Sequence, residues 1–244
     1  YGFQMGLVLH QSDTRGHARH GWLESRHTFS FAAYNDPSRV HFGVLRVLND
    51  DIVAPGMGFG RHPHDNMEIV SIPLSGELEH RDSMGNQTVI RENDVQIMSA
   101  GTGVEHSELN HSRDREVRFL QIWVFPSRRG LTPRYDQKNF SPEERHNKLQ
   151  CVVCPQGKGN GVHINQEAWF HLLDLSPGNN IRYTLNLPSN GVYAFLLEGA
   201  ATIQGQPLSR RDGLGITGQE HCGIQTESGC SVLLMEVPMM LPSR

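Results

Sequence analysis

Short apolar segments separated by turn-forming residues recur along the chain, and they constrain the fold more than any other feature. In the first half these segments are FGVLRVL (42–48), MEIVSIPL (67–74), QTVI (87–90), VQIM (95–98) and VRFLQIWVF (117–125). In the second half they are VYAFLLEG (192–199), ATIQG (201–205), GLGIT (213–217) and VLLMEV (232–237). Separators such as Asn49-Asp50-Asp51, together with 25 glycines and 13 prolines, favour turns over long helices. The pattern predicts an all-β protein built as a sandwich or barrel.

A polar stretch from Arg128 to Gln150 separates the two groups of strands and is the expected linker. Within it, Pro142–Arg145 is expected to form a helical turn capped by Ser141. A chain of 244 residues is long enough for two domains. We therefore expect domains at residues 5–135 and 136–244, with Tyr1–Gln4 set apart from the fold because they precede Met5.

The two halves also repeat the same spacing. In HPHDNMEIVSIPLSG, 14 positions separate His62 from Gly76, and in LNLPSNGVYAFLLEG 14 positions separate Leu185 from Gly199. Aligned in this way, Leu185 and Leu187 stand where His62 and His64 stand. The spacing predicts one β-barrel used twice, with any metal site confined to the first copy.

Two pairs of residues, each separated by one intervening residue, are the candidate metal ligands. Side chains two apart on a strand point to one face, so His62 and His64 can enter the same interior, with Pro63 outward on an edge strand or strand end. His106 and Glu108 repeat the spacing. Three imidazoles and a carboxylate suit a divalent transition metal better than calcium or magnesium. The ligand set does not choose among Fe(II), Ni, Cu, Mn, Co and Zn, of which Fe(II) is our first expectation, and it leaves up to two positions open.

Glu68 leaves three alternatives open. It lies four residues after His64, so on an unbroken strand it would also face inward. It could be a metal ligand, the hydrogen-bond partner of a ligating histidine, or part of a buried ion pair with an arginine. We favour Glu108 as the ligand and Glu68 as a supporting residue.

The net charge, the apolar segments and the cysteine content limit which partners the protein can bind and where in the cell we expect it. A net charge of −4 gives no electrostatic reason to bind DNA, RNA or an anionic membrane directly. The sequence shows neither a membrane-spanning run nor a signal peptide, so we expect a cytoplasmic protein with its 4 cysteines reduced. Cys151 and Cys154 should point to opposite faces of a strand and be structural. A closed barrel leaves few free edges, so we expect a monomer.

Several aromatic and histidine side chains have simpler explanations than catalysis. Trp123 is expected in the core, and His221 is expected to be a remnant or surface residue. Phe29, Phe31 and Phe59 could line an apolar pocket, although each one singly is better explained as a core residue.

The motifs resemble the pirin family of the cupin superfamily. The first cupin motif in its pirin form is similar to GFGRHPHDNMEIVSIPLSGELEHRDSMGN, and the second is similar to IMSAGTGVEHSELN. The N-terminal signature of bacterial members is similar to RGHARHGWLESRHTFSFAAYNDP. The resemblance implies a bicupin, two jelly-roll β-barrel domains in tandem, with metal in the N-terminal domain. It implies His62, His64, His106 and Glu108 as metal ligands and excludes Glu68.

The resemblance also implies an activity, since several bacterial members are quercetin 2,3-dioxygenases. The substrates would be a small aromatic flavonol and O₂, with Glu108 as the general base that takes the flavonol hydroxyl proton. The alternative is a metal-binding, redox-sensitive regulatory module that docks on a protein partner, because a related mammalian pirin is described as an iron-dependent transcriptional coregulator.

Overall fold

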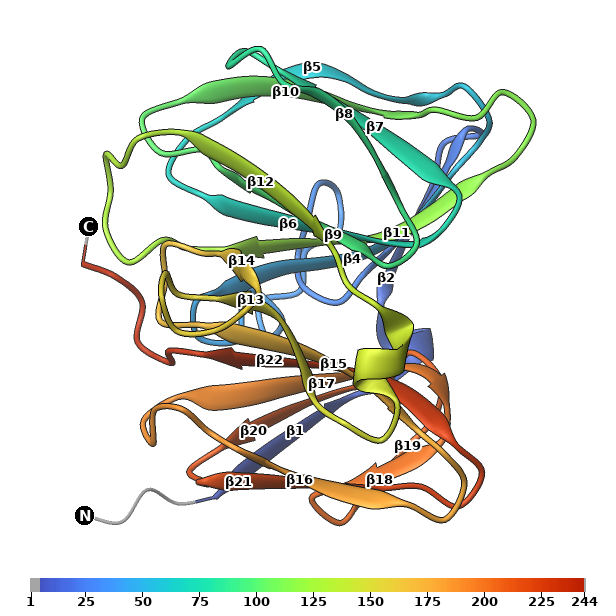
Figure 1. The fold of residues 1–244 in the computed structure, drawn as a ribbon, viewed down its shortest axis with the longest axis vertical. Coiled ribbons are helices and arrows are strands. Elements are labelled where there is room, and N and C mark those ends of the chain that lie inside the picture. Colours follow the sequence, from blue (N-terminus) through green and yellow to red (C-terminus); the bar gives the residue numbers. More distant parts are fainter. Residues whose placement is uncertain (1–4, 244) are drawn as a thin grey trace.

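The computed structural model describes residues 5–243, so the expectation about Tyr1–Gln4 lies outside the described residues. Twenty-two strands form four sheets, which stack as successive layers along the long axis of the molecule (Figure 1). The helices among the described residues are two short 3₁₀ helices, η1 (Ser12–Thr14) and η2 (Pro142–Arg145). Neither has the length or apolar character needed to cross a membrane.

The first half contains an inner sheet of seven strands and an outer sheet of four. The inner sheet has the order β12-β9-β6-β11-β4-β3-β2 and the outer sheet β5-β10-β7-β8. The inner strands are β2 (Gly16–Arg19), β3 (Leu23–His27), β4 (Leu45–Val53), β6 (Glu68–Ser75), β9 (Asp94–Ser99), β11 (Val117–Val124) and β12 (Arg134–Asn139). The outer strands are β5 (Gly58–His64), β7 (Glu77–Asp82), β8 (Gln87–Arg91) and β10 (Val104–Asn110).

The second half repeats this plan. Its inner sheet has the order β1-β20-β17-β22-β15-β13-β14 and its outer sheet β16-β21-β18-β19. The inner strands are β1 (Gly6–His10), β13 (Gln150–Cys154), β14 (Val162–His163), β15 (Trp169–Leu175), β17 (Gly191–Gly199), β20 (Gly213–Thr217) and β22 (Cys230–Val237). The outer strands are β16 (Asn180–Thr184), β18 (Ala201–Ile203), β19 (Gln206–Leu208) and β21 (His221–Gln225).

The predicted all-β architecture of two jelly rolls in tandem is confirmed, with one correction. Each half is a sandwich of two open sheets and not a closed barrel, because the first and last strands of each sheet do not pair. The two inner sheets pack back to back and share one apolar core. That core joins residues of both halves, among them Val70, Ile72, Leu120, Phe170, Phe195 and Leu233. The shared core fixes the two halves against each other.

Strand β4 corrects one predicted turn. Asn49-Asp50-Asp51 was expected to separate strands, but β4 runs through all three residues to Val53. Asp50 tolerates this position because it accepts ion pairs at 3.0 Å from both Arg15 and Arg211. A polar residue inside a strand is stable when its partner is supplied from elsewhere, and the local sequence does not reveal that partner.

The expected linker is only partly a linker. Strand β12 lies inside it and pairs with β9 of the first half, whereas β1 at the start of the chain pairs with β20 of the second half. The division at residue 135 stays a proposal, and this pairing refines it, because the division falls within β12. The predicted helical turn is the 3₁₀ helix η2, although the Ser141 hydroxyl contacts the Glu143 carboxylate and makes no capping bond to the backbone.

Two glycines at equivalent positions support the internal repeat. Gly76 has φ +80° and Gly199 has φ +81°. A Cβ at Gly76 would lie 2.6 Å from the carbonyl oxygen of Glu116, and one at Gly199 would lie 2.2 Å from that of Gly229. Each glycine therefore turns the chain at the end of a central strand where the neighbouring backbone leaves no room for a side chain.

Gly76→Ala and Gly199→Ala should each destabilise the protein by about 2–4 kcal/mol, because backbone strain and a steric clash add together. Urea unfolding of each variant measures the loss. Gly85→Ala is the matched control, since Gly85 also has positive φ (+93°) but nothing lies within 4 Å of its Cβ position. Equal losses in all three variants would contradict the close-approach argument.

Candidate metal centre

Strands β5 and β10 bring the histidines together in the outer sheet of the first half. They pair antiparallel, with His106 opposite His62 and Val104 opposite His64. Strand β5 is the edge of this sheet, which confirms the position expected from Pro63. A register shift between His106 and Glu108 marks a bulge in this pairing. The extra residue lies in β5, between Phe59 and His62, while β10 pairs regularly with β7, so His106 and Glu108 keep one face of β10 and both are buried.

The three imidazoles converge on one point. The Nε2 atom of His106 lies 3.1 Å from Nε2 of His64 and 3.0 Å from Nε2 of His62. Among residues 5–243 this is the one group of at least three histidine, cysteine or carboxylate side chains that could hold a metal ion. His62 also meets the carbonyl oxygen of Gly60 through Nδ1 at 2.6 Å, which fixes its ring and leaves Nε2 for the centre.

Burial keeps the His64 and His106 rings neutral. Desolvation, followed by the charge of His62 and His80, lowers the pKa of His106 to about 3. Desolvation, followed by the charge of His106 and His62, lowers the pKa of His64 to about 4. Neutral imidazoles present lone pairs, which is the state that a metal ion requires of its ligands.

Glu108 lies beside this group but is not a member of it. Its Oε1 atom is 3.7 Å from Nε2 of His106. The amide of Gln121 donates to the same oxygen at 2.7 Å, and the hydroxyl of Ser71 donates to Oε2 at 3.3 Å. Gln121 and Ser71 come from β11 and β6, so the inner sheet orients a carboxylate carried by the outer sheet.

Glu68 faces away from the histidines, which corrects its expected supporting role. The chain turns between β5 and β6 at Asn66, where φ is +46°, and β6 belongs to the other sheet. The Glu68 carboxylate instead accepts hydrogen bonds from Ser99 at 2.9 Å and from the backbone N–H of Asn165 at 2.6 Å. Burial raises its pKa, and the charge of Arg134 opposes that shift.

Trp123 and Phe31 line the site. The sequence predicted Trp123 to be a core residue, so its position beside His64 is a correction. The Trp123 ring is only partly buried and meets His64 edge-on at 5.1 Å between centroids. Phe31 packs against Trp123 at 5.5 Å. Phe29 is in the core between the halves, as expected, whereas Phe59 packs on Trp22.

His80 supports His106 from the other side. The two rings lie 5.5 Å apart, and Nε2 of His80 meets the Asp82 carboxylate at 2.6 Å. The ring of Tyr135 stacks on His80 at 4.6 Å. The order of strands β10 and β7, which the sequence alone does not give, explains why this contact was missed.

The second half fills its corresponding centre with protein groups. Glu236, at the position equivalent to Trp123, is fully buried and accepts hydrogen bonds from the loop that holds the two leucines. The donors are Tyr183 Oη, the backbone N–H groups of Asn186 and Leu187, and the side-chain amides of Asn186 and Asn190. His221 is exposed, which confirms the surface interpretation.

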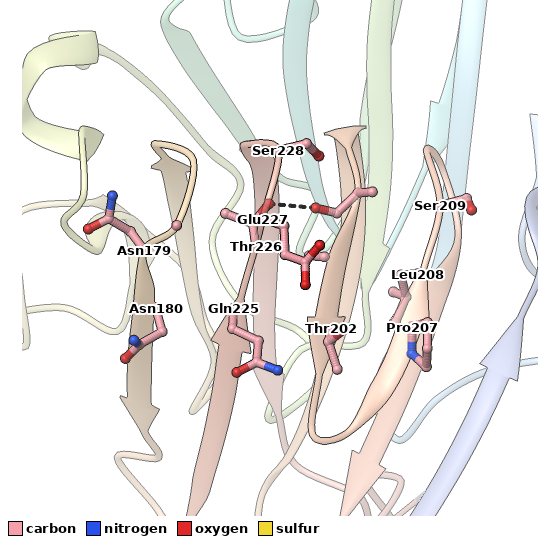
Figure 2. Close-up of a pocket in the computed structure, with 13 residues that line it drawn as sticks. Asn179, Asn180, Thr202, Pro207, Leu208, Ser209, Gln225, Thr226, Glu227 and Ser228 are labelled. Carbon is pink, nitrogen blue, oxygen red and sulfur yellow. Dashed lines mark hydrogen bonds between the residues drawn. The ribbon is translucent and has the colours of Figure 1, made fainter.

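A hollow of about 560 Å³ lies in the second half, far along the chain from the histidines (Figure 2). Small polar side chains line it, among them Thr202, Gln225 and Ser228. It contains no histidine and no candidate site residue. The candidate metal ligands therefore lie outside this hollow, in the first half.

Comparisons with known proteins agree with these features. The sequence matches the family described as Pirin over residues 8–124 and that described as Quercetinase C-terminal cupin domain over residues 151–237. A protein named quercetin 2,3-dioxygenase from Escherichia coli K12 is 39% identical over 236 residues, covering 95% of this chain and 99% of that protein. A pirin-like protein from Caulobacter vibrioides is 34% identical over 225 residues, covering 92% and 96%. A crystal structure of the bacterial pirin YhhW from Escherichia coli in complex with nickel(II) superimposes with a TM-score of 0.90 at 38% identity, covering 98% of this chain and 100% of that one.

A buried carboxyl group in the same sandwich makes stability depend on pH. The hydroxyl of Ser25 donates to Asp51, which is 3% exposed. Burial, with the charge of Glu108 adding to it, raises the pKa of Asp51 from 3.8 to about 7. The folded state thus binds this proton more tightly than the unfolded state. The resulting stability is complete below the unfolded pKa and is lost as pH rises through the folded pKa.

Asp51→Asn should remove this dependence. Relative to the variant, the wild type should lose about 1.4 kcal/mol of unfolding free energy per pH unit between roughly pH 4 and pH 7. Urea unfolding of the metal-free proteins across that window measures the slope. Asp13→Asn, at an exposed position, serves as the control. Parallel curves for wild type and Asp51→Asn would contradict the raised pKa.

Proposed function

We infer that this chain, which belongs to the pirin family, is a mononuclear metal-dependent dioxygenase that opens the ring of quercetin-type flavonols with O₂. The observation that carries the proposal is the convergence of three imidazole Nε2 atoms beside a held carboxylate. The sequence similarity to a relative named quercetin 2,3-dioxygenase supports the substrate class.

The residues present fit a divalent transition metal. Nε2 of His106 faces Nε2 of His64 at 3.1 Å and Nε2 of His62 at 3.0 Å, separations that are stable for lone pairs only when a proton or a cation lies between them. We propose His62, His64, His106 and Glu108 as the ligands. Nitrogen-rich sets with one carboxylate bind Fe(II), Ni(II) and related ions. The nickel complex of the relative supports a single divalent metal, and Fe(II) remains our expectation.

The side chains around the metal position then have separate roles in binding and proton transfer. A bound metal would lower the pKa of the flavonol 3-hydroxyl. Glu108 Oε1 accepts that proton as the general base, while Gln121 and Ser71 hold its carboxylate in place. The aromatic faces of Trp123 and Phe31 give an apolar wall on the His64 side, suited to a planar polyphenol.

The first test is metal stoichiometry. Elemental analysis of the purified protein should give one transition-metal ion per chain. His64→Leu, which introduces the residue found at the equivalent position in the second half, should lower metal affinity by at least ~100-fold because one ligand is lost. His221→Leu is the matched control in the second half and should keep full occupancy. Equal occupancy in all three proteins would refute the assigned ligands.

The second test is turnover. Metal-loaded protein should consume quercetin and O₂ with release of carbon monoxide, and Glu108→Gln should slow this by ~100-fold or more while most of the metal stays bound. Glu105→Gln is the control, since Glu105 lies on the same strand but is exposed and paired with Arg61. Absence of turnover with Fe, Ni, Cu, Mn and Co would reject the dioxygenase and favour the metal-responsive binding module.

A further inference from the structure

We propose that Cys151 and Cys154 form a second reactive site, a dithiol that peroxides oxidise to a disulfide. This site is separate from the metal centre and does not depend on the proposed function. It lies in the second half, where β13 ends and the loop from Pro155 to Gly161 leads into β14. All four cysteines are free thiols in the structure.

A bulge brings the two thiols together and overturns the expectation that they point to opposite faces. Cys151 is opposite His171 of β15, but Val153 is already opposite the adjacent residue Phe170, so the register shifts between Cys151 and Val153. The extra residue changes the side on which the following side chain emerges. The two thiols consequently lie against the same loop: the Cys151 thiol donates to the carbonyl oxygen of Val153 at 3.5 Å, and the Cys154 thiol donates to that of Gly161 at 3.9 Å.

The loop covers this pair closely. A Cβ added to Gly159 would lie 3.2 Å from Sγ of Cys154 and 3.3 Å from Sγ of Cys151, so both sulfurs border the same point. Cys154 is buried and Cys151 is partly exposed, while residues 156–160 of the loop are exposed. A small oxidant therefore has to pass only a thin glycine-rich loop.

The local charges favour one thiolate. The adjacent Cys151 thiol, with the positive charge of Lys138 adding to its effect, lowers the pKa of Cys154 to about 7. The adjacent Cys154 thiol and burial raise the pKa of Cys151. Lys138 belongs to β12 of the first half, and its ammonium group donates to the carbonyl oxygen of Asn160 in the loop. A thiolate next to a protonated thiol is the arrangement of redox-active dithiols.

The chemistry balances with a peroxide as oxidant. The thiolate attacks one peroxide oxygen, the O–O bond breaks, and a sulfenic acid and hydroxide form. The second thiol then displaces the sulfenic oxygen as water and closes the S–S bond. Two thiols and one hydrogen peroxide give one disulfide and two waters, with the cysteines oxidised by two electrons and the peroxide reduced by two.

The dithiol also lies on the path that connects the halves. The N–H of Ile164, next to β14, donates to the carbonyl oxygen of Cys154 at 3.0 Å. The next residue, Asn165, donates its N–H to Glu68 at the start of β6. Oxidation would thus change the pairing of β13 with β14, next to the residue that binds Glu68. Glu68 is the first residue of β6 and lies four residues after His64.

Tryptic peptides separate the proposed pair from an internal control. One peptide, Leu149–Lys158, carries Cys151 and Cys154, and another, Asp212–Arg244, carries Cys222 and Cys230. After treatment of the reduced, full-length protein with hydrogen peroxide and alkylation of the remaining thiols, the first peptide should appear unalkylated and about 2 Da lighter. It should form at least ~10-fold faster than any oxidised form of the second, because burial raises the pKa of Cys222 to about 12.

Two variants sharpen the test. Cys151→Ser should leave Cys154 without a disulfide partner, and Lys138→Gln should slow oxidation and raise the pH at which Cys154 is alkylated half-maximally. Lys148→Gln, at a neighbouring exposed lysine, should leave the rate of Cys151–Cys154 oxidation unchanged when followed by intact mass. Equal oxidation of both cysteine pairs, or alkylation of Cys151 and Cys154 after peroxide treatment, would overturn the proposal.

Discussion

The structure depends on holding three imidazoles together, with Nε2 of His106 at 3.1 Å from that of His64 and at 3.0 Å from that of His62. Such an arrangement gains nothing from the protein alone, because desolvation and mutual repulsion oppose protonation of the rings. It persists because the frame is stiff. The outer sheet supplies the histidines on two paired strands, and the inner sheet, fixed by the core between the halves, supplies Gln121 and Ser71 to orient Glu108. A cation at the point of convergence would satisfy lone pairs that the fold itself leaves facing one another.

The second half shows the other way to complete the same sandwich. There a buried carboxylate, Glu236, takes donors from the loop containing Leu187, so the centre is closed by hydrogen bonds within the protein. The hydrogen bonds from this loop are what allow Glu236 to be buried there, since an unpaired buried charge would be costly. Gly76 and Gly199 retain the same turn in both halves, so the frame was kept while the centre changed.

The sequence predicts much of this from spacing that is local. The strands, the repeat and the shared face of His62 and His64 follow from alternation along the chain, and the structure brings these two histidines together with His106. The sequence-based predictions are wrong where a residue's partner is distant in the sequence, or where a bulge or a change of sheet breaks the alternation of side chains. Asp50 stays in a strand because of Arg15 and Arg211. Glu68 turns away because β6 changes sheet after Asn66. Counting residues by twos along one strand cannot register a bulge or a change of sheet.

The change of sheet that turns Glu68 away from the histidines also connects the two halves of the protein. Glu68, turned away from the histidines, accepts the N–H of Asn165, and Arg134 of β12 donates to the carbonyl oxygen of His163. Both contacts tie β14 of the second half to strands that frame the metal centre. The second half, although its own centre holds no histidine group, therefore has a structural part in the first: it fixes the start of the strand that carries Ser71, which holds Glu108. Without the second half, the buried Glu68 carboxylate would lose the backbone N–H of Asn165 and keep the Ser99 hydroxyl as its donor, so the two halves depend on each other mechanically.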